Sequence, residues 1–400
     1  MELPSVMNHS PRLLPTLAAI AALTAAILAH AAVPQVDLLW DQTLRDVNAG
    51  KLDDALGHAH TATEIAPTSV DAWRLLGWVY ERRGEAAKAE AAYRQAIAFA
   101  PRRALLQTDL ASALAREEKY EKAAIVYRRA IALDPDFTPA RIGLALLLAE
   151  HFGKAREAVA EVRRAVRLRP EEGSYHNLLG TLLADYGQPE AAIEEYRAAI
   201  QLGRDDLAAS FSNLGYALQD QGEMPEAVSM GQEAVVVGAD PQVVGGAHNN
   251  LAYAFAYQGK WVQAAQEAKA AQDLLPDDSH VADTVGVVAL MSGKLDDAET
   301  SLRRALSLPD PSASSRTALA WCLAKQGKPD EARRELGNAA REIRDEHAPI
   351  EVLFFAGKAY AELGQEGKAL IIFQRAMKLY PKHPWSAEMR KFDTDQPPDY

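Results

Sequence analysis

Cysteine is almost absent from this chain of 400 residues, in which Cys322 is the only one. A single thiol cannot form a disulfide within the chain, so a small fold held together by a disulfide framework is excluded. Cys322 stands among apolar residues, which predicts a buried and unreactive thiol. Packing of side chains must therefore stabilise the fold.

Motifs for catalysis are missing as well. The chain contains no GxxxxGK[ST] phosphate loop, no HExxH zinc motif, no paired CxxC and no GxSxG elbow. His58 and His60 are two residues apart, and at that spacing two helical residues do not share a face. We therefore expect no catalytic residue, no metal site, no cofactor and no enzyme activity.

The chain also lacks an excess of positive charge. It has 43 Lys and Arg against 55 Asp and Glu, which gives a net charge of −12 at pH 7. Nucleic-acid partners select clustered Lys and Arg, so this balance argues against them and for a protein or peptide partner. It also slightly favours partners that are cationic.

What the sequence does have is a regular spacing of alanine. A first set recurs every 34 to 37 residues, and a second alanine follows each member seven residues later. The first set is Ala55, Ala89, Ala123, Ala158, Ala192, Ala227, Ala264, Ala298, Ala332 and Ala369. Such a period indicates a stacked array of repeats, each of which buries its faces against its neighbours.

The most complete repeat runs from Asp71 to Pro101 and reads DAWRLLGWVYERRGEAAKAEAAYRQAIAFAP. It resembles the tetratricopeptide repeat, and the matching positions are Trp73, Leu76, Gly77, Tyr80, Gly84, Ala89, Tyr93, Ala96 and Pro101. The resemblance implies an all-α, right-handed superhelical solenoid of about ten helix-turn-helix repeats over residues 35–381. It implies a binding scaffold but names no partner, because such repeats serve many unrelated ones.

Residues 1–31 differ in character and are predicted to be a signal peptide or a membrane anchor. Leu13 to Ala29 is uncharged, and Ala29-His30-Ala31 fits the small-x-small rule for signal peptidase. A stretch of 17 residues is at the lower edge of what spans a bilayer, so a cleaved signal and an uncleaved anchor are both open. A helix buried in the fold is the third alternative.

Either of the first two alternatives predicts an extracytoplasmic location, in a bacterial periplasm, for the repeats. The protein would be secreted there or anchored to the inner membrane, with a membrane tether through residues 13–29.

Three further segments depart from the repeat. We expect residues 382–392 to form a capping helix around Trp385 and Met389, and residues 393–400 to be a disordered tail. Two repeats carry three extra residues, near residues 238–246 and 341–350. There we expect longer connecting loops, the alternative being a bend in the solenoid.

In this fold the leading helix of each repeat faces the concave surface. With Trp73, Phe211 and His248 counted as the fourth position of their repeats, positions five, six, nine, twelve and thirteen line a groove. The predicted peptide-binding residues are Asn177, Ser212, Asn213, Tyr216, Asn249, Asn250, Tyr253, Tyr257, Trp78 and Trp321. The two tryptophans are either apolar anchors for a partner or partly buried neighbours of the adjacent repeat.

Asn213 and Asn250 occupy the same sixth position in neighbouring repeats. An amide has both a donor and an acceptor, so it can bond both groups of a peptide unit. The pair looks like the asparagine ladder of the repeats of O-linked N-acetylglucosamine transferase, which grip peptide backbone. The alternative is that asparagine simply suits a polar concave face.

These observations favour a non-catalytic protein–protein interaction scaffold of the cell envelope that binds a protein or an extended peptide in its concave groove. One alternative is a subunit of an envelope assembly machine for polysaccharide export, pilus biogenesis or secretion. The other is an enzyme without a known motif that acts on envelope glycans. That enzyme would need a pair of carboxylates converging in the groove.

The location outside the cytoplasm is testable. A reporter enzyme that is active only outside the cytoplasm, fused after Tyr400, should be active, and mass spectrometry should find Ala32 at the mature N-terminus if the signal is cleaved. An inactive reporter on a full-length protein recovered from the cytoplasm would contradict the prediction.

Overall fold

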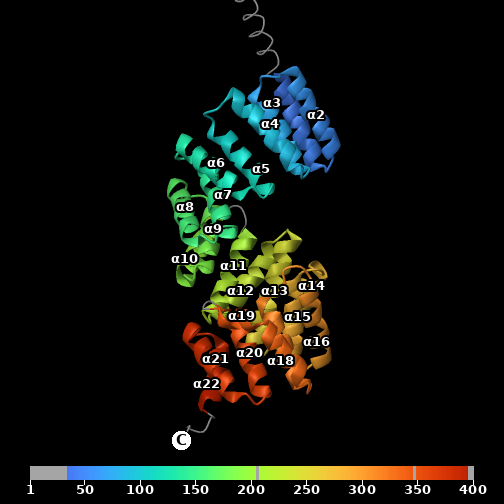
Figure 1. Ribbon diagram of the computed structural model, residues 1–400, viewed down its shortest axis with the longest axis vertical. Helices are drawn as coiled ribbons and strands as arrows, with labels where there is room; N and C mark the ends of the chain where they lie inside the picture. Colours follow the sequence, from blue (N-terminus) through green and yellow to red (C-terminus); the bar gives the residue numbers. More distant parts are fainter. Residues whose placement is uncertain (1–33, 204–206, 346–347, 395–400) are drawn as a thin grey trace, which may run out of the picture. The chain divides into compact units, whose positions relative to one another are not determined.

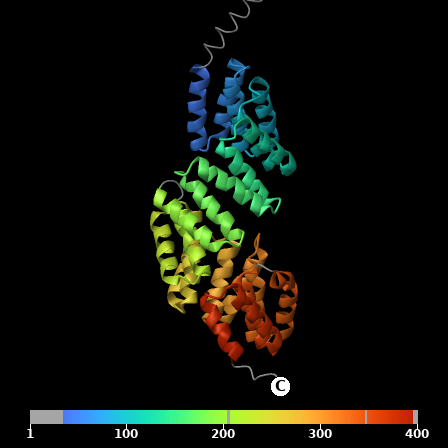
Figure 2. The same cartoon turned by 90° about the vertical axis from the view of Figure 1, so that its left-hand side faces the viewer.

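The computed structural model describes residues 34–203, 207–345 and 348–394. Within these ranges the regular structure is helical and no residue is in a strand. Successive helices run antiparallel to one another in hairpins (Figures 1 and 2). The chain divides into two compact units, with the boundary between Leu168 and Arg169.

In the first unit, helical residues 34–48 pack against the helix that follows them, and three more hairpins complete the unit. The helices are α2 (Leu52–Ile65), α3 (Val70–Arg82) with α4 (Ala86–Phe99), α5 (Ala104–Arg116) with α6 (Tyr120–Leu133), and α7 (Thr138–Glu150) with α8 (Ala155–Leu168).

The second unit continues the series with six hairpins, a short helix and a final helix. They are α9 (Gly173–Asp185) with α10 (Pro189–Leu202), α11 (Leu207–Asp220) with α12 (Met224–Val237), α13 (Pro241–Tyr257) with α14 (Trp261–Leu274), α15 (Ser279–Met291) with α16 (Leu295–Ser307), α17 (Ala313–Lys325) with α18 (Pro329–Asn338), the short α19 (Ala340–Arg344), α20 (Ile350–Glu362) with α21 (Glu366–Leu379), and α22 (Pro384–Thr394).

The periodic alanines lie at the contacts between helices. In the first set the exposed fraction is at most 1%, and in the second set it is at most 4%, the highest value being that of Ala199. A methyl side chain at such a contact allows two helix axes to approach to about 8–10 Å. The predicted all-α repeat fold is confirmed.

Turns between paired helices depend on a left-handed residue. Gly84, between α3 and α4, has a φ of 75°, and glycine adopts this conformation without the clash that a Cβ causes. The third repeat has Glu118 in the equivalent turn, with a φ of 58°. An L-residue accepts this conformation at a cost of about 1–2 kcal/mol, so this turn carries local strain.

The expected longer loop before α13 is wrong. The extra residues lengthen the helix instead, since α13 has 17 residues where most leading helices have 13. Asp240 and Pro241 explain the early start. The Asp240 side chain accepts a hydrogen bond from the backbone N–H of Gln242 (2.8 Å), and proline is favoured at the first helical position. Near the second insertion the chain forms α19.

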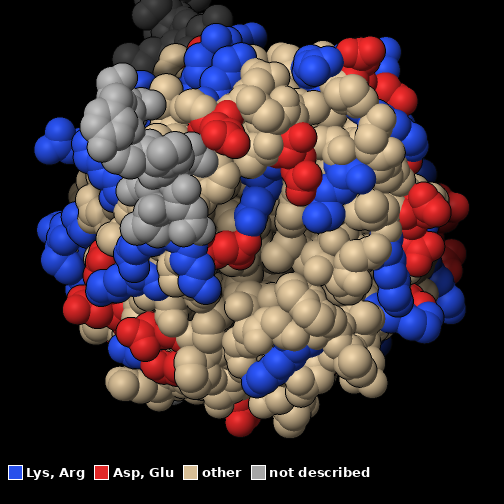
Figure 3. All heavy atoms as spheres, turned by 90° about the horizontal axis from the view of Figure 1, so that it is seen from below, with Lys and Arg blue, Asp and Glu red and all other residues tan. Residues whose placement is uncertain are grey.

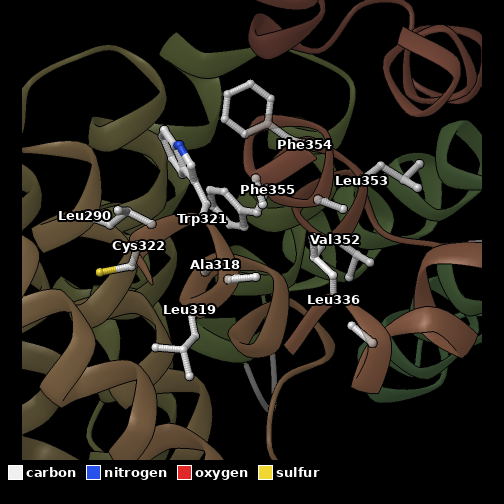
Figure 4. Packing of buried hydrophobic residues seen from close by; sticks show 14 of the residues in the cluster. Leu290, Ala318, Leu319, Trp321, Cys322, Leu336, Val352, Leu353, Phe354 and Phe355 are labelled. Atoms are coloured by element: carbon white, nitrogen blue, oxygen red, sulfur yellow. The ribbon is translucent and has the colours of Figure 1, made fainter. Parts of the chain in front are cut away.

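Cys322 is fully buried in the core of the second unit (Figure 4). Its Sγ donates a hydrogen bond to the Leu295 carbonyl at 3.3 Å, and burial raises the pKa of the thiol to about 11. The predicted burial is confirmed, and the raised pKa disfavours the thiolate, which is the reactive form.

The tenth repeat, which is the last in the chain, packs back against the sixth and seventh repeats. Tyr257 of α13 meets Trp385 of α22 with ring centroids 4.8 Å apart, and its hydroxyl donates to Glu351 of α20 at 2.6 Å. A Cβ at Gly222 would collide with the carbonyl oxygen of Lys382. Trp385 and Met389 are buried, so α22 covers the apolar face of the last hairpin.

The predicted signal or anchor at residues 1–31 lies outside the described residues, as do residues 395–400 of the predicted tail. Among the helices that the structure describes, none has both the length and the hydropathy that a bilayer crossing requires.

Candidate binding site in the second unit

The leading helices of the sixth to tenth repeats surround a cavity of about 310 Å³. Helices α11, α13 and α15 pack side by side and supply most of its wall, and the starts of α17 and α20 supply the rest. The cavity exists because the tenth repeat returns against the seventh. It is the natural place to look for a ligand, since binding sites are concave and combine apolar walls with a few polar groups.

Three tyrosines form one side of the cavity. Tyr216 lies on α11 and is 50% exposed, whereas Tyr253 and Tyr257 lie on α13 and are half-buried. Tyr253 donates to Asp283 Oδ2 at 2.8 Å, in the same way that Tyr257 donates to Glu351. These bonds hold the hydroxyl groups of Tyr253 and Tyr257, and the Tyr257 ring also packs against His383 and Trp385.

Three carboxyl groups line the same cavity, but their surroundings differ. Asp283 is 2% exposed and fully bonded, because Ser314 (2.9 Å) and Ser315 (2.6 Å) also donate to it. Glu351 accepts from the hydroxyl group of Tyr257 and from a backbone N–H. Asp220 has no hydrogen bond or ion pair with any described residue.

The cavity has more acidic than basic side chains. Among the described residues that line it there is no Lys or Arg, and its one basic side chain is His280, whose charge lowers the pKa of Asp283. Burial raises the pKa of all three carboxyl groups, and for Asp220 the combination of burial and repulsion from Glu351 raises it to about 8. A strongly shifted pKa in a concave site marks a candidate functional residue.

Five of the predicted groove residues line the cavity, namely Tyr216, Asn249, Asn250, Tyr253 and Tyr257. Asn177, Ser212 and Asn213 do not line it and take part in bonds between repeats. Asn213 Nδ2 donates to Asn177 Oδ1 at 3.2 Å, and Asn250 Nδ2 donates to Ser212 Oγ at 3.2 Å. The amide donors of the expected ladder are thus engaged within the protein, and a ladder on a bound peptide stays a prediction.

The two tryptophans do not join this site. Trp321 is 7% exposed and stacks on Phe355 at 6.0 Å in the core shown in Figure 4, so it is a buried neighbour of the adjacent repeat and no exposed anchor. Trp78 belongs to the first unit and is half-buried in its core cluster. Of the two interpretations offered for these residues, partial or full burial is the one that the structure shows.

Sequence reasoning did not single out the carboxyl groups. Asp220 and Asp283 nevertheless stand at the thirteenth and fifth positions of their repeats, so the same counting of groove positions includes them. Glu351 stands at a second position, outside that rule, and enters the cavity only because the tenth repeat returns. Counting positions within a repeat therefore could not predict that Glu351 belongs to the site.

His58 and His60 bond separately to Asp46 (2.9 Å) and Tyr80 (3.1 Å). No group of three or more potential metal ligands occurs in the part of the chain that the structure describes. On the face drawn in Figure 3, wherever grey atoms do not cover it, basic and acidic side chains are interspersed without a large patch of one sign.

With this architecture, the chain is a helical repeat protein. Profiles described as "Tetratricopeptide repeat" match residues 44–104, 88–136, 114–182, 173–206, 207–238, 286–349 and 350–383. Together these matches cover most of the described chain. The chain belongs to the tetratricopeptide repeat family.

Individual relatives are distant. Protein FlbA of Caulobacter vibrioides is 27% identical over 158 residues, which are 40% of this chain and only 26% of FlbA. Among solved structures, the APC/C hetero-tetramer Cut9-Hcn1 is similar over 72% of this chain and 56% of that one, with 20% identity and a TM-score of 0.54. A human IFIT1 dimer with m7Gppp-AAAA matches over 88% of this chain and 94% of that one, with 15% identity and a TM-score of 0.50. At these identities the structures share the fold alone.

The unpaired Asp220 predicts a pH-dependent stability. The folded carboxyl group keeps its proton up to about pH 8, whereas in the unfolded chain aspartate releases it near pH 4. Folding therefore takes up a proton in this window, and the free energy of unfolding falls as the pH rises through it. The charged or titratable groups that face Asp220 are Glu351, Tyr216, Tyr257 and Tyr380, and none of them is cationic.

Asp220→Asn should therefore stabilise the second unit at pH 8 by about 1–3 kcal/mol, and should flatten the decline between pH 5 and pH 8. Urea unfolding at several pH values measures both effects. Glu233→Gln, on the exposed face of α12, is the control that removes a charge away from the cavity. Equal pH slopes for wild type and Asp220→Asn would contradict the assignment.

Proposed function

We propose that this protein is a non-catalytic interaction scaffold of the cell envelope, and that the cavity of the second unit receives a segment of a partner protein. One observation carries the proposal: three tyrosines and two asparagine amides from α11 and α13 converge on a single concave site. Tyrosine is enriched where interfaces concentrate their binding energy, and amides suit peptide backbone. The tetratricopeptide repeat fold is in general a scaffold of this kind.

The location in the envelope rests on the sequence of residues 13–31 alone. The tether through residues 13–29 has the same basis. The location and the tether are both independent of the cavity. The reporter fused after Tyr400 tests the location on which both depend.

A nucleic acid is a poor ligand for this cavity. The human IFIT1 structure is one with m7Gppp-AAAA, but here three carboxyl groups line the site and no Lys or Arg does among the described residues. Phosphate binding requires the opposite charge.

A second candidate function is hydrolysis of an envelope glycan, and the convergence of Asp220 and Glu351 favours it. Glycosidases use a pair of carboxyl groups of which one is protonated at neutral pH. If this is the function, Asp220→Asn and Glu351→Gln will each abolish the release of soluble fragments from purified peptidoglycan. A binding scaffold releases none, with or without these substitutions.

The binding proposal is tested by crosslinking in intact cells, followed by recovery of the protein and quantitative mass spectrometry. Tyr216→Ala should reduce recovery of the specific partner by about tenfold or more, since truncation of a central aromatic anchor costs at least about 2 kcal/mol. The ring of Tyr216 is half exposed, so its loss should leave the melting temperature nearly unchanged.

Phe99→Ala provides the matched control, because Phe99 is 45% exposed and lies on α4 in the first unit. An unchanged partner profile for Tyr216→Ala would show that the cavity is not the binding site.

A further inference from the structure

The polar groups of the cavity leave a deficit of donors. Asp283 is saturated by Tyr253, Ser314 and Ser315, but the Asp220 carboxylate has no donor. Asn249 Oδ1 is buried and also has no hydrogen-bond partner. Asn249 Oδ1 is thus a buried acceptor without a partner, and such an atom costs stability until a donor reaches it. A ligand that completes the site must bring a hydrogen-bond donor.

The wall of the cavity also has no Lys or Arg side chain among the described residues. Asp220 and Glu351 face the cavity, whereas His280 interacts with Asp283. Asp185 stands at the same thirteenth position one repeat earlier, and its negative charge extends to Tyr216. A cation entering from solvent would therefore meet several negative charges in a concave site, where field lines are concentrated.

The tyrosine rings further restrict which positively charged group fits the cavity. The side chains of Tyr216, Tyr253 and Tyr257 line the same cavity, and the faces of tyrosine rings attract cations. Guanidinium stacks on such rings while its planar fork of five N–H groups reaches carboxylate and amide oxygens. An ammonium group satisfies fewer of the acceptors and stacks less well. The cavity, at about 310 Å³, has room for one long side chain.

We propose that the cavity binds the side chain of an arginine in the partner polypeptide, with its guanidinium group bonded to Asp220 and Asn249 between the tyrosine rings. The proposal rests on the proposed function, because it specifies what the bound segment carries. It gives Asp220 a role: the carboxyl group that has no partner in the free protein ionises and pairs with the guanidinium group when the segment binds.

The test uses the full-length protein and two blocked pentapeptides, one with a central arginine flanked by serine and glycine, the other with citrulline in its place. Citrulline has nearly the shape of arginine but no charge. In calorimetric titrations up to about 20 mM peptide, the arginine peptide should bind with a Kd near the millimolar range. The citrulline peptide should bind about tenfold or more weakly, and arginine binding should weaken with added salt.

The variants locate the contact. Asp220→Asn should weaken binding of the arginine peptide about tenfold and should leave the citrulline peptide unaffected, while Glu233→Gln should change neither. Asp220→Asn is expected to fold, since an amide of nearly the same shape replaces a carboxyl group that has no ion pair. Equal binding of the two peptides, no detectable binding of the arginine peptide, or an unchanged affinity in Asp220→Asn would each overturn the proposal.

The outcomes separate this inference from the proposed function. If Tyr216→Ala loses the cellular partner but arginine and citrulline bind alike, the cavity is a protein-binding site without a preference for cations. If the partner is retained while arginine binds through Asp220, the scaffold proposal for this cavity fails. Spermidine that binds more tightly than the arginine peptide would assign the cavity to a free polyamine and overturn the polypeptide partner.

Discussion

The contact between two alanine-bearing helix faces is the constraint on which the rest of this structure depends. Each repeat has a methyl group at the point where its two helices meet, and these methyl groups are buried in every described repeat. Larger side chains would separate the axes, and because each repeat contacts mainly its neighbours, a change in one spacing alters the path of all later repeats. Within the second unit, the tenth repeat packs back against the seventh. The cavity, its tyrosine wall and its carboxyl groups follow from that return.

The fold could be predicted because its signal is repeated. Ala55 and Ala369 lie more than three hundred residues apart in the sequence and do the same task, so even weakly matching repeats between them could be placed in register. The early start of α13 was harder to predict, because Asp240 and Pro241 cap a helix through local bonds that a repeat pattern does not contain. Glu118 in a turn that elsewhere uses glycine is a similar local departure.

The site was only partly predictable, for a physical reason. Tyr216, Tyr253 and Tyr257 lie on leading helices, so position within the repeat was enough to place them on the concave side. Trp321 obeyed the same counting and is nevertheless buried, because Phe354 and Phe355 of the next leading helix pack against it. Glu351 reaches the site through a contact across 94 residues. Position in a repeat predicts which side of the array a residue faces. Contacts between distant repeats depend instead on the curvature of the array, which is the sum of the packing angles of all the repeats between them. The contact between the seventh and tenth repeats places Asp220 and Glu351 in one cavity that no Lys or Arg of the described residues lines.

The central claim is that the tenth repeat closes against the seventh, and the bond from Tyr257 to Glu351 tests it most directly. A double-mutant cycle of Tyr257→Phe and Glu351→Met, measured by urea unfolding, reports the energy with which these two side chains interact in solution. Tyr257→Phe keeps the ring that meets His383 and Trp385, so the cycle isolates the hydroxyl contact. The account predicts a coupling free energy of about 1 kcal/mol or more. Effects that add to within about 0.3 kcal/mol, as expected for residues far apart, would contradict the closed arrangement and the cavity that depends on it.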